Sequence, residues 1–396
     1  MIKKIHVEPI RKKDIYLGGS LLTKREVESA IEDVVRQVRC NMKYFGTKFP
    51  SSAAKDQTYG IIENIEWTDG FWTGLLWLCY EYTGDQEFRQ LAQQNVSSFL
   101  NRVEKRIELD HHDLGFLYCL SCVAGYKLTG SKDARKAGLL AADKLMERFQ
   151  EKGGFIQAWG ELGARDNYRV IIDCLLNIPL LYWAAKVTGD HTYKDAAVRH
   201  YETACNHVIR QDASAYHTFY FDPETGKPIK GVTRQGYSDD SAWARGQAWG
   251  VYGIPLNYRY TRDDSAFNLF EGMTNYFLNR LPEDDVCYWD LIFTDGDCQP
   301  RDSSAAAVAV CGIHEMLKYL PEVHPDKETY QYAMHRILRS LMEGYANPDI
   351  KEGAPVLLHG VYSWHSGKGV DEGNIWGDYY YMEALMRFYK DWNLYW

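Results

Sequence analysis

Two aspartates in this chain of 396 residues have the surroundings expected of acid–base groups. Asp173 lies in an otherwise apolar helical run, and Asp113 follows two histidines. A carboxylate among apolar side chains is costly unless it is partnered or protonated, and a second carboxylate nearby raises its pKa further. The pair therefore predicts general acid–base catalysis by Asp173 with help from Asp113. An ordinary helix-start aspartate bonded to the backbone is the alternative for Asp173.

A repeated junction indicates how these aspartates are positioned. Thr-Gly followed by Asp or Ser occurs at Thr83, Thr129 and Thr188, and a fourth copy has Arg262 in place of glycine. The glycine can adopt the left-handed conformation that ends a helix, and the next side chain can accept hydrogen bonds at the start of another. Because the copies are unequally spaced, they exclude a regular solenoid and predict helical hairpins joined by loops of variable length.

Hydrophobic periodicity around the junctions predicts twelve helices. They are expected near residues 24–44, 69–83, 85–105, 110–128, 132–150, 169–187, 190–209, 242–261, 263–280, 302–320, 326–345 and 373–391. No convincing sheet is predicted, although short strands are expected around 215–232 and 355–365. Six hairpins that close on themselves give an all-α fold, an (α/α)6-barrel of six inner and six outer helices in which the last helix pairs with the first.

The chain is expected to form a single catalytic domain, 1–396, with residues 1–20 as an N-terminal extension. A two-lobed helical protein divided in the 210–240 loop is the alternative. In a ring of hairpins the long loops share one face, and loops carry sites. Tryptophans at the loop–helix junctions then predict the walls of a sugar pocket, although for each tryptophan alone a place in the core is the alternative. The whole pattern favours a carbohydrate-active hydrolase.

Composition excludes several other classes. The formal net charge of −9 leaves no broad basic surface for nucleic acid, and no apolar run reaches the length of a membrane span. Nine cysteines, mostly in apolar helical patterns, indicate reduced thiols in a cytoplasmic protein. The His111-His112-Asp113 motif lacks the i, i+4 histidine spacing of a metal site. We therefore expect no metal and no cofactor.

Four separated blocks resemble the unsaturated glucuronyl hydrolases of glycoside hydrolase family 88. They are H-H-D-L-G-F from His111, R-V-I-I-D-C-L-L-N-I-P from Arg169, S-A-W-A-R-G-Q-A-W-G from Ser241 and D-E-G-N-I-W-G-D-Y-Y from Asp371. The resemblance covers nearly the whole chain and implies an α/α-barrel that needs no metal. It also implies that Asp173 protonates C4 of a 4,5-unsaturated uronic acid and then activates the water that adds at C5, so that the ring opens and the neighbouring sugar is released.

The same resemblance implies a set of substrate-binding residues around the sugar. These are Trp67, His112, Trp159, His217, Gln235, Trp243, Arg245 and Trp249, with Asp113 orienting ring hydroxyls. Either Arg245 or Arg234 is expected to hold the uronate carboxylate, since a planar guanidinium suits bidentate recognition.

The segment with Ser363, Ser366 and Lys368 resembles members of the family that accept sulfated disaccharides; a solvated polar turn is the alternative. The expected partners are unsaturated glycosaminoglycan disaccharides of chondroitin, hyaluronan or heparin type, and the chain is expected to be a monomer or small homo-oligomer. Rival functions are an unsaturated rhamnogalacturonyl (galacturonyl) hydrolase acting on pectin fragments, a sugar epimerase with histidine acid–base pairs, and a non-catalytic sugar-binding module.

Overall fold

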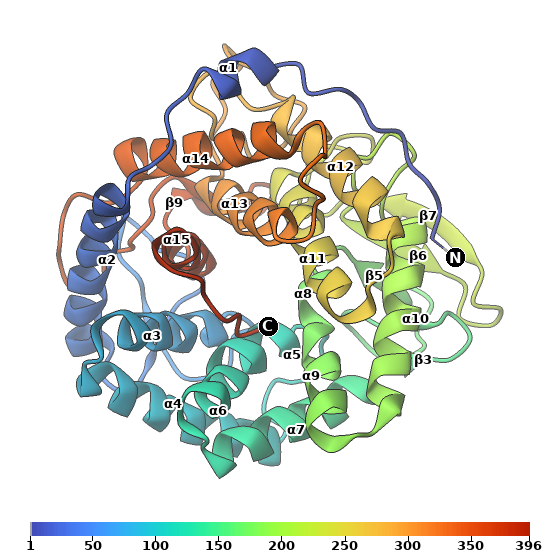
Figure 1. Ribbon diagram of the computed structural model, residues 1–396. Coiled ribbons are helices and arrows are strands. Elements are labelled where there is room, and N and C mark those ends of the chain that lie inside the picture. The colour runs from blue at the N-terminus through green and yellow to red at the C-terminus, as the bar shows by residue number, and fades with distance from the viewer. Residues whose placement is uncertain (1) are drawn as a thin grey trace.

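The structure is a computed structural model that describes residues 2–396, and most of the chain is helical (Figure 1). The helices are α1 (Lys13–Leu17), α2 (Lys24–Phe45), α3 (Asp69–Thr83), α4 (Gln86–Glu104), α5 (Leu114–Tyr118), α6 (Ala124–Thr129), α7 (Lys132–Met146), α8 (Cys174–Asn177), α9 (Pro179–Thr188), α10 (His191–His207), α11 (Ala244–Thr261), α12 (Ser265–Leu278), α13 (Ser303–Leu317), α14 (Lys327–Gly344) and α15 (Ile375–Tyr389), with a π-helical turn η1 (Cys119–Val123) between α5 and α6. The strands are β1 (Phe49–Pro50), β2 (Ile61–Ile62), β3 (Phe149–Gln150), β4 (Phe155–Ile156), β5 (Arg169–Ile171), β6 (Thr218–Phe221), β7 (Pro228–Val232), β8 (Gly360–Ser363) and β9 (Lys368–Glu372).

The inner helices contact one another in cyclic order. Contacts run from α3 to α5, α8, α11, α13 and α15, and α15 returns to α3. Each inner segment packs against the outer helix that follows it, and α15 packs against α2. Figure 1 shows α2, α4, α7, α10, α12 and α14 on the outside of this arrangement. The prediction that the last helix pairs with the first is confirmed.

The hairpin turns have the predicted geometry. Gly84, Gly130 and Gly189 are all left-handed and end α3, α6 and α9. The side chains of Asp85, Ser131 and Asp190 then accept hydrogen bonds from backbone N–H groups in the first turns of α4, α7 and α10. At the fourth junction Arg262 takes the left-handed conformation itself, with φ of 55°.

The predicted helix at 169–187 is wrong at its beginning. Residues Arg169–Ile171 form β5, which pairs antiparallel with β6, and β6 pairs with β7. The β-branched run Val170–Ile172 suits a strand, so the helical path begins only at Cys174 and restarts at Pro179, a residue favoured at the first helical position. Asp173 consequently lies at the start of the inner helix and not one turn inside it. Strands were expected around 215–232 and 355–365, and β6, β7 and β8 lie there.

The predicted helix at 110–128 is divided into α5, η1 and α6. A π-helical turn inserts one extra residue per turn and changes the direction in which later side chains point. The segment before α2 runs along the outside, where Lys12 Nζ donates to the Leu281 carbonyl (2.6 Å) and α1 contacts α14 (Figure 1). No helix within residues 2–396 is long and apolar enough to cross a membrane.

Gly115 sets the distance between α5 and α8. A Cβ at this position would lie 2.3 Å from the Cα of Asn177. Gly115→Ala is therefore expected to lower the free energy of unfolding by about 1–3 kcal/mol or more, because the two helix starts must separate. Urea denaturation measures this. The matched control is Gly344→Ala in the last turn of α14, where an added Cβ meets no heavy atom within 4 Å. Equal stabilities of the two variants would contradict this explanation of Gly115.

Candidate active site

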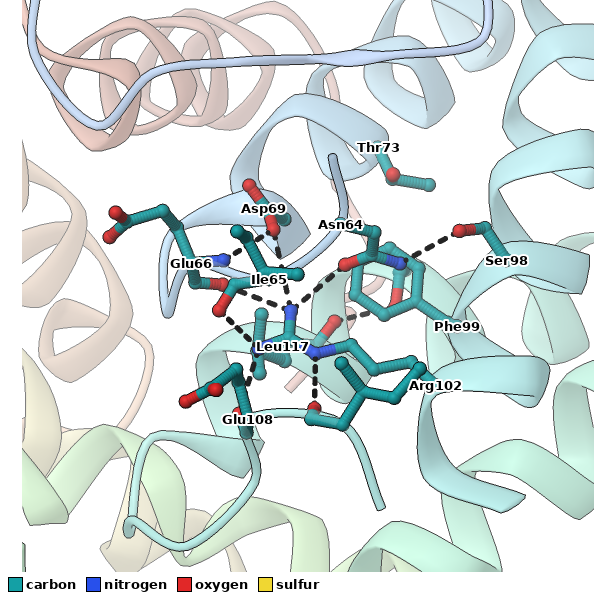
Figure 2. A network of polar contacts seen from close by, with 12 residues as sticks. Asn64, Ile65, Glu66, Asp69, Thr73, Ser98, Phe99, Arg102, Glu108 and Leu117 are labelled. Atoms are coloured by element: carbon teal, nitrogen blue, oxygen red, sulfur yellow. Dashed lines mark hydrogen bonds and ion pairs between the residues drawn. The ribbon is translucent and has the colours of Figure 1, made fainter. Parts of the chain in front are cut away.

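The loops that lead into α3 and α5 are held by one buried arginine from α4. The Arg102 side chain is 1% exposed. Figure 2 shows its guanidinium at the centre of a polar network. It donates to the carbonyls of Ile65, Glu66, Ile107 and Glu108 and to the side chains of Asn64 and Asp69, at 2.9–3.3 Å. Because these loops also carry Trp67 and His111–Asp113, Arg102 fixes two parts of the site relative to each other.

Asp113 and Asp173 both face one nitrogen of His112. The Nε2 atom of His112 lies 3.4 Å from Asp113 Oδ1 and 3.3 Å from Asp173 Oδ1. The Asp113 side chain is 3% exposed, whereas that of Asp173 is 18% exposed. Asp173 is therefore the more exposed of the two carboxyl groups.

Asn177 joins the two aspartates, and sequence reasoning missed it. Its Nδ2 donates to Asp113 Oδ1 and to the backbone carbonyl of Asp173, both at 3.3 Å. Its Oδ1 accepts from the Phe116 N–H at 2.9 Å. A polar side chain four residues after Asp173 in an otherwise apolar helix was the available signal, because a buried amide needs partners for all its polar atoms.

Burial is the main influence on the acidity of the pair. It raises the pKa of Asp113 to about 7, against hydrogen bonds from Asn177 and Trp159 that favour the charged form. Burial and then the charge of Asp113 raise the pKa of Asp173 well above its usual range, opposed by the charge of Arg245. Burial lowers the pKa of His112 well below its usual range, so this ring is neutral. The surroundings of Asp173 thus favour its protonated, proton-donating form.

His111 has a positioning role. Its Nδ1 accepts from the Asp113 N–H (3.1 Å), and its Nε2 is 3.1 Å from the Glu108 carbonyl, to which it donates. Its ring stacks on Trp159, with centroids 4.5 Å apart, and Trp159 is 37% exposed. Trp159 therefore offers an open aromatic face beside Asp113.

Ligand atoms of His112, Asp113 and Asp173 lie within 4.8 Å of one another, close enough to share a metal ion. In the described part of the chain no other group of three or more His, Cys, Asp or Glu residues is so arranged. The expectation that the reaction needs no metal stays a prediction.

The β5–β6–β7 sheet forms one side of the site. His217 binds the start of the inner helix, since its carbonyl accepts from the Ile172 N–H at 3.1 Å, and its ring packs edge-on against Trp243 (5.1 Å). Burial lowers the pKa of His217 to about 3. Arg234, which is exposed, donates to the Tyr220 hydroxyl at 3.1 Å, and Gln235 follows it. The segment that carries His217 and Gln235 is therefore a wall built on a sheet.

Arg245 makes its hydrogen bonds to other groups of the protein. It is 2% exposed and donates to Asp302 Oδ2 (2.7 Å) and to the carbonyls of Val361 and Tyr362. Its guanidinium carbon lies 4.3 Å from the ring centre of Trp243. Of the two arginines considered for the uronate carboxylate, Arg234 is the one with an exposed guanidinium. Asp302, which precedes α13, was missed as the partner of Arg245.

The β8–β9 hairpin brings the predicted sulfate-binding residues to the same face. Ser363 ends β8 and Lys368 begins β9, with exposed Ser366 in the turn between them. Lys368 Nζ lies 4.3 Å from the ring centre of Tyr362, whose hydroxyl accepts from Trp67 Nε1 at 3.0 Å. The hairpin also contacts the neighbouring loop, because His365 Nε2 lies 2.7 Å from the Gly236 carbonyl.

The tryptophans differ in exposure. Trp67 is half-buried and stacks on Trp376, with centroids 5.5 Å apart. Trp243 is 6% exposed and Trp249 only 1%. Trp249 packs against Phe116, with ring centroids 5.4 Å apart. It is therefore a core tryptophan without an open ring face, as the alternative to a pocket wall predicted.

Comparison with known proteins assigns this arrangement to a family. Residues 41–314 match the model of Glycosyl Hydrolase Family 88, and the chain belongs to this family. The chain is 65% identical to the unsaturated chondroitin disaccharide hydrolase of Streptococcus agalactiae over 395 residues, covering 100% of this chain and 99% of the relative. It is 44% identical to the unsaturated glucuronyl hydrolase of Bacillus sp. strain GL1 over 370 residues, covering 93% and 98%.

Solved structures of unsaturated glucuronyl hydrolases have the same fold as this chain. The crystal structure of unsaturated glucuronyl hydrolase from Streptococcus agalactiae superposes with a TM-score of 0.99 at 65% identity, covering 100% of both chains. An Asp-to-Asn variant of that enzyme, complexed with dGlcA-GalNAc6S, gives a TM-score of 0.92 at 60% identity, also covering 100% of both chains.

Removing the charge of Asp113 should change the pH dependence of turnover. An acid must be protonated to donate, so kcat is lost as the pH rises through the raised pKa of Asp173. Asp113→Asn is expected to move this alkaline limb to lower pH by about one unit, because like-charge repulsion no longer raises the pKa of Asp173. The pH–rate profiles of the variant and the wild type measure the shift.

The control is Asp378→Asn, which removes a different buried carboxyl group whose pKa is raised to about 7 by burial. It should leave the alkaline limb in place. If the alkaline limb of the Asp113→Asn profile is unchanged or moves to higher pH, Asp113 does not raise the pKa of Asp173.

Proposed function

We propose that this protein hydrolyses unsaturated disaccharides derived from chondroitin, releasing 4,5-unsaturated glucuronic acid from the non-reducing end. One observation carries the proposal: the pKa of a partly exposed carboxyl group, Asp173, is raised well above its usual range by burial and by the charge of its buried neighbour, Asp113. Full-length similarity to unsaturated chondroitin disaccharide hydrolases supports the substrate class.

Asp173 delivers its proton to C4 of the substrate's C4=C5 bond, and positive charge develops at C5 beside the ring oxygen. The resulting Asp173 carboxylate then takes a proton from the water that adds at C5. The hemiketal that forms is unstable, so the ring opens and the neighbouring sugar leaves. A residue that acts first as acid and then as base needs a pKa near the working pH, and the surroundings of Asp173 raise its pKa in that direction.

Asp113 keeps the pKa of Asp173 raised and orients ring hydroxyls. His112 stabilises the carboxylates through Nε2, while Trp67, Trp159, His217, Gln235 and Trp243 bound the sugar, and Arg245 with Trp249 holds the wall and floor. Arg234 meets the anionic group of the uronic acid, since its guanidinium is exposed on the β-sheet wall.

The geometry disfavours a sugar epimerase with histidine acid–base pairs. His111 has both ring nitrogens engaged by backbone groups, and burial lowers the pKa of His112 and His217 far enough to keep both rings neutral. Neither can donate a proton at neutral pH as readily as Asp173.

The fold is proposed to be a closed (α/α)6-barrel formed by one domain, 1–396, which the cyclic contacts of the inner helices support. A monomer or small homo-oligomer and a cytoplasmic location are proposed with it. For the location, the support is that all nine cysteines are free and seven of them are buried.

Asp173→Asn should lower kcat on unsaturated chondroitin disaccharide by about 10²- to 10⁴-fold, because the amide can neither donate the proton nor accept one from water. Loss of absorbance of the conjugated uronic acid measures turnover, and calorimetry should still detect binding. Asp166→Asn, an exposed aspartate of the preceding loop, is the control and should keep wild-type activity. A Asp173→Asn variant with most of its activity would exclude this mechanism.

Lys368→Ala tests recognition of sulfate. It should lower kcat/KM on a disaccharide with 6-sulfated N-acetylgalactosamine by about tenfold or more, since one charge-assisted hydrogen bond is lost. The unsulfated disaccharide should lose less than about threefold, because Lys368 then has no anionic partner to meet. Lys230→Ala, an exposed lysine of β7, is the control. Equal losses on both substrates would assign Lys368 to the solvated turn.

A further inference from the structure

Arg169 of β5 is a nearly buried arginine outside the set of predicted site residues. It is 7% exposed and stands opposite Tyr220 in the β5–β6 pair. Directly paired residues of neighbouring strands point to the same face of a sheet, and Arg169 Nη1 donates to the Tyr220 hydroxyl at 2.9 Å. Arg234 Nη2 donates to the same hydroxyl at 3.1 Å. Two guanidinium groups therefore converge on one phenol oxygen.

The Arg169 guanidinium has no counter-ion. The buried arginines Arg102, Arg245 and Arg387 each have a carboxylate oxygen at 2.7–3.3 Å. Within residues 2–396 no Asp or Glu forms such an ion pair with Arg169, and a buried charge without an opposite charge is costly.

One edge of the same guanidinium also lacks hydrogen-bond partners. Arg169 Nε is buried and donates to no described residue, and Nη2 donates to none either, although it is not fully buried. The Nε and Nη2 donors lie side by side, in the arrangement that binds the two oxygens of a carboxylate. Arg169 is therefore suited to an anion that the protein itself does not supply.

The Tyr220 hydroxyl adds another donor. Its oxygen accepts from both arginines, and its own O–H donates to no described residue. Burial raises the pKa of Tyr220, but the hydrogen bonds and charges of the two arginines outweigh burial, so the pKa is lowered. Arg169, Tyr220 and Arg234, which we call the two-arginine cluster, thus present only donors and positive charge.

The two-arginine cluster lies at the candidate active site. The Ala158 N–H donates to the Arg169 carbonyl at 3.1 Å, which places Arg169 beside the segment that carries Trp159. Burial is the main cause of the lowered pKa of both His112 and His217, and the positive charge of Arg169 contributes to each. Arg169 is therefore close to two residues of the site wall.

The position of Arg169 in the chain indicates which anion it meets. Arg169 precedes Asp173 by four residues, so their Cα atoms are at most about 14 Å apart. In the proposed reaction Asp173 protonates C4, and the uronate carboxylate is attached to the neighbouring carbon, C5. The carboxylate must therefore bind near Asp173, whereas a sulfate on the second sugar is expected at the β8–β9 hairpin.

We propose that the two-arginine cluster binds the uronate carboxylate, with Arg169 holding both oxygens through Nε and Nη2 and with Tyr220 and Arg234 donating to the same group. This inference rests on the proposed function and adds Arg169 and Tyr220 to Arg234. Because the carboxylate is bound both before and during protonation of C4, the cluster acts mainly on KM.

A substrate with a neutral ester tests the assignment. The wild type should lose about tenfold or more in kcat/KM on the methyl ester of the unsaturated chondroitin disaccharide, because charge-assisted hydrogen bonds are lost. Arg169→Met should lose about tenfold on the free acid, mainly through KM, but less than about threefold on the ester. If Arg169→Met loses the same factor on both substrates, its role is structural and the proposal is wrong.

A second variant and a control accompany this experiment. Tyr220→Phe keeps the ring but removes the hydroxyl, and should raise KM about three- to tenfold on the acid while leaving the ester unchanged. Arg165→Met is the control, because Arg165 is an exposed arginine of the preceding loop, paired with Glu224 at 3.0 Å. It should keep the wild-type ratio of acid to ester. If it changes that ratio as much as Arg169→Met does, the effect comes from general charge and the proposal is wrong.

Thermal unfolding separates a failure of this site from a failure of the proposed function. Sodium glucuronate should raise the wild-type midpoint above that in glucose with sodium chloride at equal ionic strength, and Arg169→Met should lack this difference. If sodium sulfate stabilises the wild type through Arg169 and glucuronate does not, the cluster is a sulfate site and the carboxylate assignment is wrong. If the wild type fails to hydrolyse unsaturated disaccharides but glucuronate stabilises it through Arg169, the proposed function fails and the carboxylate site remains.

Discussion

Two carboxyl groups must share a space from which most water is excluded, and the rest of the site is arranged around that constraint. Burial makes the charged forms costly, so Asp113 and Asp173 need partners that restrain them without neutralising them. One such partner is Asn177 of α8, which donates to Asp113. The other is His112, which lies in the same loop as Asp113 and has its Nε2 close to both carboxyl groups. The two aspartates then differ in exposure, because Asp173 is partly exposed and Asp113 is buried.

Loops could not hold this geometry without anchors. Arg102 joins the loops before α3 and α5, and Arg245 joins α11 to the β8–β9 hairpin. Both arginines are buried, and their donors meet backbone carbonyls of the segments that they join. A guanidinium suits this because it presents five donors in a fixed plane. Through Arg102, the outer helix α4 thus contributes to the position of the site loops.

Much of the architecture follows from local sequence signals. The Thr-Gly junctions predict where each hairpin turns, because the left-handed conformation and the next side-chain cap are properties of adjacent residues. The Asp113 and Asp173 pair could also be selected, since a carboxyl group in an apolar run is unusual. Local signals failed at 169–172, where β-branched residues join a strand whose partner, β6, lies more than 40 residues away.

The missed residues share a physical reason. Asn177 and Asp302 act through partners that are distant in sequence, and no periodicity identifies such pairs. Their types were visible, as polar side chains in apolar surroundings, but the partner of each depends on how helices pack. The burial of Trp249 was equally hidden, because a tryptophan at a loop–helix junction can face either the pocket or the core.

Arg245 links the β8–β9 hairpin to the surroundings of Asp173. It binds the carbonyls of Val361 and Tyr362 at the base of the hairpin that carries Lys368, and its positive charge acts against protonation of Asp173. The hairpin and the acid are thus linked through a single cation. A change in the backbone of this hairpin would therefore also move the cation that opposes the raised pKa of Asp173.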